Sequence, residues 1–265
     1  MDEKALLSKQ LEAQEQGRGY ATVTIVESDG STPRSNGKML VYEDGSTEGT
    51  VGGGAMERMA VKDAMEYLRV GKSALRTYDL TSPASETGMT CGGHMTVWIE
   101  AFSAKPLLVV CGAGHVGGAL LPLARTVGFR TMLFDNRDLE LIQDKTELAD
   151  VFVPIKDYEK DLPKIDLPEG AFYVIVTFGH HFDAEALKAV LKKNGAYVGM
   201  IGSRKKVQAV YDRLKGEGVS EQVLSTVYSP IGLDIGGETP EEIAVSILAE
   251  MLMVKNGRTG KPMKQ

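Results

Sequence analysis

Residues 107–118 read LLVVCGAGHVGG, an apolar run followed at once by closely spaced glycines. The run is typical of a buried strand, and Gly112, Gly114 and Gly117 give the spacing G-x-G-x-x-G at the start of a predicted helix. In such a strand-turn-helix unit the first glycine makes the turn, the second admits a pyrophosphate and the third lets helix and strand pack closely. Asp135 ends the next predicted strand, about 20 residues on, where the acid that binds a ribose hydroxyl is expected. The stretch predicts a Rossmann-type domain.

The sequence of this loop does not decide which ligand it binds. His115 lies inside the loop, where its side chain would face the phosphates or the neighbouring domain. The alternative is a histidine at the helix start that bonds to solvent or backbone. A Rossmann domain that no longer binds a dinucleotide can keep these glycines for the turn alone. No Ser-Tyr-x-x-x-Lys set or other hydride-transfer arrangement follows in the sequence, which disfavours an NAD(P)-dependent oxidoreductase.

Apolar runs and helical periods alternate through the rest of the C-terminal half. We expect strands at residues 131–135, 172–177 and 196–201, and helices at residues 183–193 and 203–216. Continuous apolar strands separated by helices indicate a parallel sheet covered on both faces. The last helix is expected to start at Thr239, with Pro240 in its first position and Glu242 in its third.

The first hundred residues have a different pattern. We expect helices at residues 5–16 and 55–69, strands at residues 20–26, 75–80 and 95–102, and a hairpin of residues 38–42 and 46–51 around Asp44-Gly45. The predicted fold class is therefore α/β, a Rossmann-like parallel-sheet domain preceded by a smaller mixed α+β domain. We expect the N-terminal domain to span residues 1–103 and the C-terminal domain to span residues 104–265.

Composition narrows the class of protein. A net charge of −6 disfavours a nucleic-acid binder, which needs a clustered basic surface. Two cysteines in 265 residues make no disulfide framework and suit a reducing compartment. The sequence shows neither a signal-peptide pattern nor the roughly 18 consecutive apolar residues of a membrane span, so we expect a cytoplasmic protein without a membrane partner.

Cys91 follows Thr90 and precedes two glycines, which would leave its sulfur open to a ligand. A thiolate suits a soft metal such as molybdenum or copper, whereas a lone cysteine cannot build a zinc site. The alternative is a small buried cysteine in a tight turn.

A second glycine cluster precedes the predicted helix at residues 55–69. Gly52, Gly53 and Gly54 suit an anion at the start of that helix, and Arg34 is a candidate bidentate phosphate partner or a surface ion-pair residue. Glu57, one turn into the helix, caps it or contacts a ligand ring.

His180 and His181 with Asp183 invite a metal interpretation. Adjacent histidines point in different directions and no third ligand is evident, so we favour Asp183 as a helix N-cap instead.

Several motifs occur together in one order. They are STPR at 31–34, GTVGGGAME at 49–57, MTCGG at 89–93, GAGHVG at 112–117, GSRKK at 202–206, PIGLDIG at 230–236 and TPEEIA at 239–244. Together they resemble the xanthine dehydrogenase accessory factor (XdhC/CoxI) family. The resemblance implies a molybdenum-cofactor chaperone that is not itself an enzyme. Such a protein binds the pterin cofactor, presents it to a cysteine desulfurase for sulfuration, and passes it to a xanthine-dehydrogenase-type hydroxylase.

Residue chemistry suggests how the motifs would divide the molybdenum cofactor. We expect Cys91 near the molybdenum or its dithiolene and Arg34 with the glycine turn near a phosphate. The Rossmann loop would hold a nucleotide portion or NAD(P).

Ser203, Arg204 and Asp234 follow predicted strands, at the carboxyl edge where open α/β sheets bind ligands, although ordinary loop and cap chemistry would also explain them. Edge strands in the smaller domain suggest a homodimer. The alternatives are an NAD(P)-dependent oxidoreductase and a purely structural assembly protein.

Overall fold

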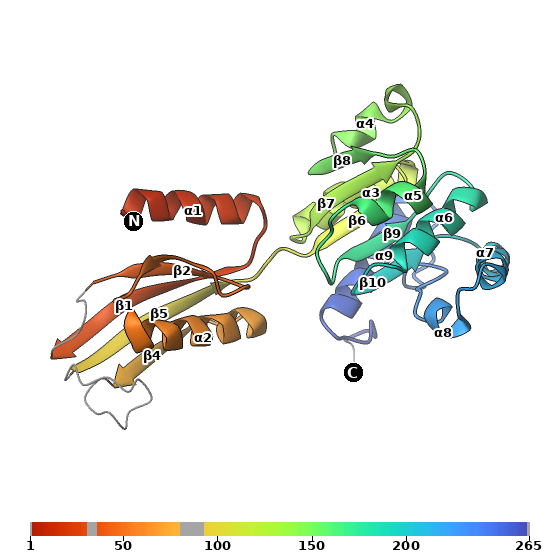
Figure 1. Cartoon of the computed structure of the whole chain (residues 1–265). Coiled ribbons are helices and arrows are strands. Elements are labelled where there is room, and N and C mark those ends of the chain that lie inside the picture. Colours follow the sequence, from red (N-terminus) through yellow and green to blue (C-terminus); the bar gives the residue numbers. More distant parts are fainter. Residues whose placement is uncertain (1, 31–35, 80–92, 264–265) are drawn as a thin grey trace. The chain divides into compact units, whose positions relative to one another are not determined.

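The computed structural model describes residues 2–30, 36–79 and 93–263, and the chain forms two compact units, Met1–Lys105 and Pro106–Gln265. The N-terminal unit has a five-stranded antiparallel sheet, and the C-terminal unit has a five-stranded parallel sheet (Figure 1). The predicted fold class, a Rossmann-like domain preceded by a mixed α+β domain, is confirmed. Among the helices of the described residues, none has the length and apolar character needed to cross a membrane.

The N-terminal unit consists of α1(Glu3–Glu15), β1(Tyr20–Gly30), β2(Lys38–Tyr42), β3(Thr47–Thr50), α2(Gly54–Val70), β4(Ala74–Asp79) and β5(Gly93–Phe102), with strand order β3-β2-β1-β5-β4. Figure 1 shows α1 on one face of the sheet and α2 on the other. Alternation along β1 explains this, because Tyr20 packs in the cluster under α1 whereas Ala21 and Val23 pack in the cluster under α2.

The predicted hairpin joins β2 to β3. Gly45 has a φ of 80°, which favours glycine, and Tyr42 pairs with Ser46 across the turn at 2.9 Å from nitrogen to oxygen. The carboxylate of Asp44 accepts hydrogen bonds from the backbone and the hydroxyl of Ser46. Turn chemistry that is visible in the sequence therefore fixes the register of this edge of the sheet.

The C-terminal unit contains five strands: β6(Leu107–Cys111), β7(Arg130–Asp135), β8(Val151–Pro154), β9(Phe172–Ile175) and β10(Tyr197–Met200). Its longer helices are α3(His115–Thr126), α6(His180–Val190), α7(Arg204–Gly216) and α9(Pro240–Lys255), and its short helices are η1(Leu139–Leu141), α4(Gln143–Thr146), α5(Tyr158–Asp161), η2(Leu162–Lys164) and α8(Glu221–Leu224).

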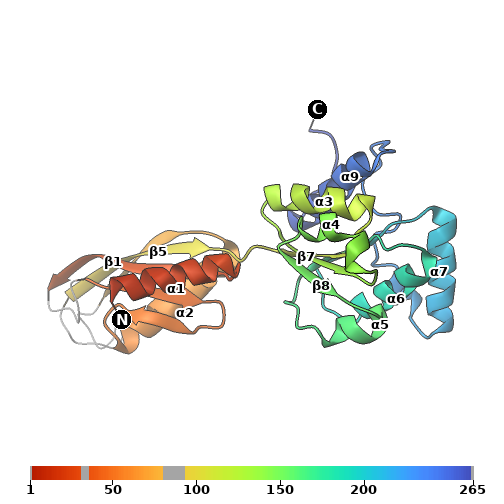
Figure 2. The same ribbon diagram turned by 90° about the horizontal axis from the view of Figure 1, so that it is seen from above.

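The strand order is β10-β9-β6-β7-β8, so the chain reverses its direction of travel across the sheet between β6 and β9. Open α/β sheets bind ligands beyond the carboxyl ends of the strands at such a switch point. One face of the sheet packs against α3 and α9, and the other packs against α5, α6 and α7, as Figure 2 also shows. Strand β6 is buried along its whole length, which explains its uninterrupted apolar sequence.

Two helix starts test the capping predictions. Thr239 caps α9 as expected, because its side chain accepts from the backbone of Glu242 and the Glu242 carboxylate bonds back to the Thr239 backbone. The N-cap prediction for Asp183 is wrong, because α6 begins at His180 and Gly179 is its N-cap. The carboxylate of Asp183 reaches back instead to Thr177, ahead of the helix.

Candidate functional site

The glycine-rich loop lies between β6 and α3 at the switch point. Gly112 has a φ of 117°, and a Cβ there would collide with the carbonyl oxygen of Val176, the residue that follows β9. A Cβ at Gly117 would collide with the carbonyl oxygen of Gly112. Both glycines are therefore required by the fold itself, one for the turn and one for the close approach of α3.

Gly114 differs from these two glycines. It is the N-cap of α3 with a φ of −77°, which any residue can adopt, and a Cβ there would come no closer than 3.9 Å to another part of the chain. Contacts within the described residues thus give no steric reason for glycine at this position. The absence of a side chain instead leaves the start of α3 open to a ligand.

Asp135 is buried beneath the loop and only 1% exposed. Its Oδ2 accepts from the backbone nitrogen of Ala113 at 2.6 Å and from Nη2 of Arg137 at 2.7 Å. Its Oδ1 accepts from the backbone nitrogen and Nε of Arg137, both at 2.9 Å. Burial acts to raise the pKa of Asp135, but the hydrogen bonds from Arg137 and Ala113 outweigh it and lower the pKa overall. Four donors occupy the carboxylate, which leaves no lone pair for a ribose hydroxyl.

A second buried acid organises the loop after β9. Asp183 is fully buried, and its Oδ1 accepts from the backbone and the hydroxyl of Thr177 at 3.2 and 2.5 Å. Nζ of Lys206, from α7, lies 2.5 Å from its Oδ2 and neutralises the charge. This network holds the loop while Phe178, the residue after Thr177, stays 76% exposed. At the carboxyl edge of the sheet, the exposed Phe178 side chain is therefore carried by a loop that the Asp183 contacts hold in place.

The other predicted residues of this unit lie at or near helix starts and loops. His115 is exposed at the first position of α3, and Arg204 is exposed at the first position of α7. Ser203 is the N-cap of α7 and accepts from the backbone of Lys206 at 3.3 Å, so its hydroxyl has a structural role.

Asp234 lies exposed in the loop that leads to α9. The buried Glu250 of α9 holds this loop by accepting from the backbone nitrogen of Gly232 at 2.9 Å and from the hydroxyl of Tyr197 at 2.6 Å. Ser246 donates to the carbonyl oxygen of Leu233 at 2.5 Å. Two contacts with α9 therefore anchor the loop just before Asp234.

In the N-terminal unit, Gly52, Gly53 and Gly54 all have positive φ, which are conformations that other residues rarely adopt. Oε2 of Glu57 accepts from the hydroxyl of Thr50, from the backbone nitrogen of Val51 at 3.0 Å and from that of Gly53 at 3.1 Å. Burial acts to raise the pKa of Glu57, but these hydrogen bonds outweigh it and lower the pKa. Glu57 therefore stabilises the glycine turn, as the capping interpretation expects.

Arg34 and Cys91 lie outside the described residues. Within the part of the chain that the structure describes, no group of three or more His, Cys, Asp or Glu side chains could hold a metal ion. His181 instead lies 3.0 Å from both Glu185 and Arg213.

Sequence reasoning missed three charged residues that organise this edge, namely Arg137, Lys206 and Glu250. Arg137 and Lys206 look like ordinary surface cations, and their partners are far away or across a turn. Glu250 had a visible signal, because it is an acid inside an otherwise apolar helix.

Fold and site together define a protein in which a Rossmann-type domain follows a separate α+β unit along the chain. The family described as XdhC Rossmann domain matches residues 108–251, and the XdhC and CoxI family matches residues 13–79. The chain belongs to the XdhC/CoxI family, because the first match covers more than half of its length.

Three relatives are similar to this chain. The Escherichia coli (strain K12) "Uncharacterized protein YqeB" is 35% identical over 93% of this chain and 46% of its own length. A protein of Bacillus subtilis (strain 168) named as a probable xanthine dehydrogenase subunit is 29% identical over 60% of this chain and 46% of its own. The Escherichia coli (strain K12) "Molybdenum cofactor insertion chaperone PaoD" is 25% identical over 96% of this chain and 89% of its own. The chain thus spans about half the length of the first two relatives.

A solved structure described as a xanthine dehydrogenase from Bacillus halodurans is similar over 94% of this chain and 96% of its own, with 22% identity and a TM-score of 0.49.

Proposed function

We propose that this chain is an accessory protein, not an enzyme, that binds the molybdenum cofactor as cargo and delivers it to a xanthine-dehydrogenase-type hydroxylase. One observation carries the proposal. The protein named as a molybdenum cofactor insertion chaperone aligns with both units, over 96% of this chain and 89% of its own length. The relative whose name places it in a probable xanthine dehydrogenase supports the same class of client.

The geometry of the Rossmann unit supports binding of an anionic ligand. Gly114 leaves the start of α3 open without any steric need from the fold, and His115 is exposed beside it. We propose that Gly112, Gly114, His115 and Gly117 receive a phosphate of the cargo, with Ser203, Arg204 and Asp234 on neighbouring loops of the carboxyl edge. Because the Asp135 carboxylate is filled by four donors, we assign it the positioning of the loop.

In the N-terminal unit we propose that Arg34 and the Gly52 to Gly54 turn hold a phosphate and that the Cys91 thiolate contacts the molybdenum or its dithiolene. Glu57 positions the turn from within. Presentation of the cargo to a cysteine desulfurase for sulfuration is part of the same proposal.

The alternative, an NAD(P)-dependent oxidoreductase, has less support. The glycine loop fits a dinucleotide, but the acid expected to bind its ribose is buried under Arg137. Titration with NADH and NADPH, followed by their fluorescence, would favour this alternative only if turnover accompanied binding.

The proposal is tested by anaerobic binding of isolated molybdenum cofactor and its transfer to an apo xanthine dehydrogenase. We expect the intact protein to bind the cofactor and restore hydroxylase activity, and Cys91→Ala to bind it at least about tenfold more weakly. Cys111→Ala is the matched control, because that thiol is fully buried in β6 and cannot reach a cargo. Absence of binding by the intact protein would contradict the chaperone function, whereas equal binding by Cys91→Ala would contradict only the role of the thiol.

A further inference from the structure

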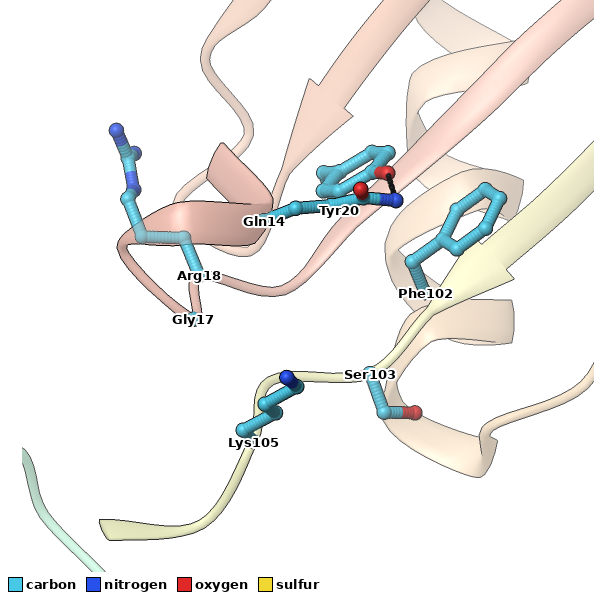
Figure 3. A pocket seen from close by; sticks show the side chains of 7 residues that line it. All are labelled: Gln14, Gly17, Arg18, Tyr20, Phe102, Ser103 and Lys105. Atoms are coloured by element: carbon cyan, nitrogen blue, oxygen red, sulfur yellow. Dashed lines mark hydrogen bonds between the residues drawn. The ribbon is translucent and has the colours of Figure 1, made fainter. Parts of the chain in front are cut away.

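A cavity of about 460 Å³ opens at one end of the N-terminal sheet, and none of its lining residues belongs to the sequence motifs. Residues from the end of α1, the following turn, the start of β1 and the segment after β5 line it. They are Gln14, Gly17, Arg18, Tyr20, Phe102, Ser103 and Lys105 (Figure 3). Ligand pockets in proteins have volumes of roughly 300–1,000 Å³, so the cavity has room for a small organic molecule.

The lining has the chemistry of an anion site with an apolar wall. Arg18 and Lys105 bring two positive charges, and none of the described residues that line the cavity is acidic. The ring of Phe102 forms the apolar side, and the remaining polar groups are an amide and two hydroxyls. An anion attached to an apolar or planar group matches this combination.

The walls of the cavity are fixed by contacts within the unit. The ring of Phe102 stacks on the ring of Tyr20 with centroids 4.8 Å apart, and Nε2 of Gln14 lies 2.8 Å from the Tyr20 hydroxyl. The backbone nitrogen of Lys105 donates to the carbonyl oxygen of Gly17 at 3.3 Å, which ties the segment after β5 to the turn after α1. A ligand would therefore meet walls that are already in place.

The two cations are not equivalent. In Figure 3 the Lys105 ammonium lies across an open space from Gln14 and Tyr20, whereas Arg18 extends away from Phe102. The Arg18 guanidinium lies over the ring of Tyr42, 4.3 Å from its centroid. Lys105 is thus placed for direct contact with an anion, and Arg18 adds positive charge at the rim.

The cavity and the Gly30–Gly93 pair lie at opposite ends of β1 and β5. Tyr20 pairs with Phe102 at the cavity, and Gly30 pairs with Gly93 at the other end of the same two strands. Ten residue steps along a strand cover roughly 33 Å. Gly30 and Gly93 are the strand residues that adjoin the Arg34 and Cys91 motifs in sequence.

We propose that this cavity is a second binding site, for a phosphate monoester that carries a planar ring, such as a mononucleotide. The phosphate contacts Lys105, and the ring packs against Phe102. This goes beyond cargo binding and gives the N-terminal unit a ligand of its own.

The test is titration of the ¹⁵N-labelled full chain with GMP, guanosine and inorganic phosphate, read by amide chemical shifts. GMP is expected to shift the amides of Gly17, Ser103 and Lys105, and guanosine to bind about tenfold more weakly because it lacks the charge. Shifts confined to the C-terminal unit, or none at all, would overturn the proposal. Equal affinity for guanosine would refute the phosphate contact, and equal affinity for inorganic phosphate would refute the ring contact.

Variants separate the two contacts. Lys105→Gln should weaken GMP binding about fivefold or more, whereas Lys62→Gln, on an exposed position of α2, should leave it unchanged. Phe102→Leu should weaken binding of GMP and leave that of inorganic phosphate unchanged. If Phe102→Leu does not fold, the comparison of Lys105→Gln with Lys62→Gln still decides the proposal, because equal GMP affinity in the two would overturn it. Cofactor transfer to apo hydroxylase is a separate readout, so failure here leaves the chaperone function standing.

Discussion

The carboxylate of Asp135 and the guanidinium of Arg137 form a paired contact beneath the glycine-rich loop, with distances of 2.9 Å from Nε to Oδ1 and 2.7 Å from Nη2 to Oδ2. The same carboxylate holds the backbone nitrogen of Ala113 at 2.6 Å. One side chain at the end of β7 therefore sets the shape of the loop between β6 and α3.

Removal of this carboxylate should destabilise the fold. Asp135→Ala leaves the buried nitrogen of Ala113 and part of Arg137 without an acceptor. We expect the free energy of unfolding to fall by about 3 kcal/mol. This value is at the low end for a broken buried ion pair because Arg137 is partly exposed. Urea denaturation measures the loss. Asp138→Ala, on an exposed neighbouring position, is the control and should change stability by less than about 0.5 kcal/mol. A loss for Asp135→Ala no larger than that of the control would refute the structural role.

The Asp135–Arg137 pair should also make the stability of the fold depend on pH in the acid range. Because the pKa of Asp135 is lowered from its ordinary value of 3.8 in the folded state, its contribution is complete above that value and is lost as the pH falls through the folded-state pKa. The difference in unfolding free energy between the intact protein and Asp135→Asn should be constant from pH 5 to pH 7 and shrink below about pH 4. A difference that stays constant down to pH 2 would contradict the lowered pKa.

Two glycines of the loop, Gly112 and Gly114, should respond differently to alanine. Gly112→Ala places a Cβ against the Val176 carbonyl at a φ of 117°, and we expect a loss of about 2–4 kcal/mol. Gly114→Ala should cost less than about 1 kcal/mol, because its φ is ordinary and the space around it is free. The same variant should weaken binding of cofactor at the loop, and thermal melts with binding measurements separate the two effects. Equal destabilisation by both variants would contradict the assignment of Gly114 to a ligand.

How far the sequence predicts this molecule depends on the range of the interactions. The Asp44-Gly45 hairpin, the Thr239 cap and the apolar strand before Gly112 rest on neighbours within a few residues, and the structure has all three. Asp183 was misassigned because its partners are a hydroxyl ahead of the helix and a lysine on another helix. The sequence alone cannot decide whether an acid such as Asp183 caps the nearby helix or pairs with a distant lysine, because the second choice depends on tertiary contacts.

The candidate site shows the same division. The positions of Gly112 and Gly117 follow from the strand-turn-helix pattern, which is local, and the position of Asp135 follows from the end of the next strand. That the Asp135 carboxylate is paired with Arg137 depends on side-chain placement two residues away, which no spacing rule gives.

The glycine turn of the N-terminal unit should depend on Glu57. Glu57→Ala removes the acceptor for the nitrogens of Val51 and Gly53, and we expect a loss of about 1 kcal/mol because the site is partly exposed. Glu66→Ala, an exposed position on the same helix, should change stability by less than about 0.5 kcal/mol. Chemical denaturation measures the stability of the two variants. Equal stabilities would contradict the role of Glu57 in stabilising the turn.

Glu250 should control the loop that carries Asp234. Its carboxylate joins the Tyr197 hydroxyl to the Gly232 nitrogen, and burial together with this hydrogen bond raises the pKa of Tyr197. Glu250→Ala leaves the buried Tyr197 hydroxyl and the partly buried Gly232 nitrogen without an acceptor, so we expect a loss of about 2–4 kcal/mol and faster hydrogen exchange at the Gly232 amide. Glu250→Gln keeps one acceptor oxygen and should recover part of both effects.

The matched control is Glu241→Ala, at an exposed position of the same helix. Loss of stability with unchanged exchange at Gly232 would mean that Glu250 supports the helix packing alone. Faster exchange at Gly232 that Glu250→Gln reverses would instead establish that a buried acid of α9 fixes the loop before Asp234, because the amide is released only when its acceptor is removed.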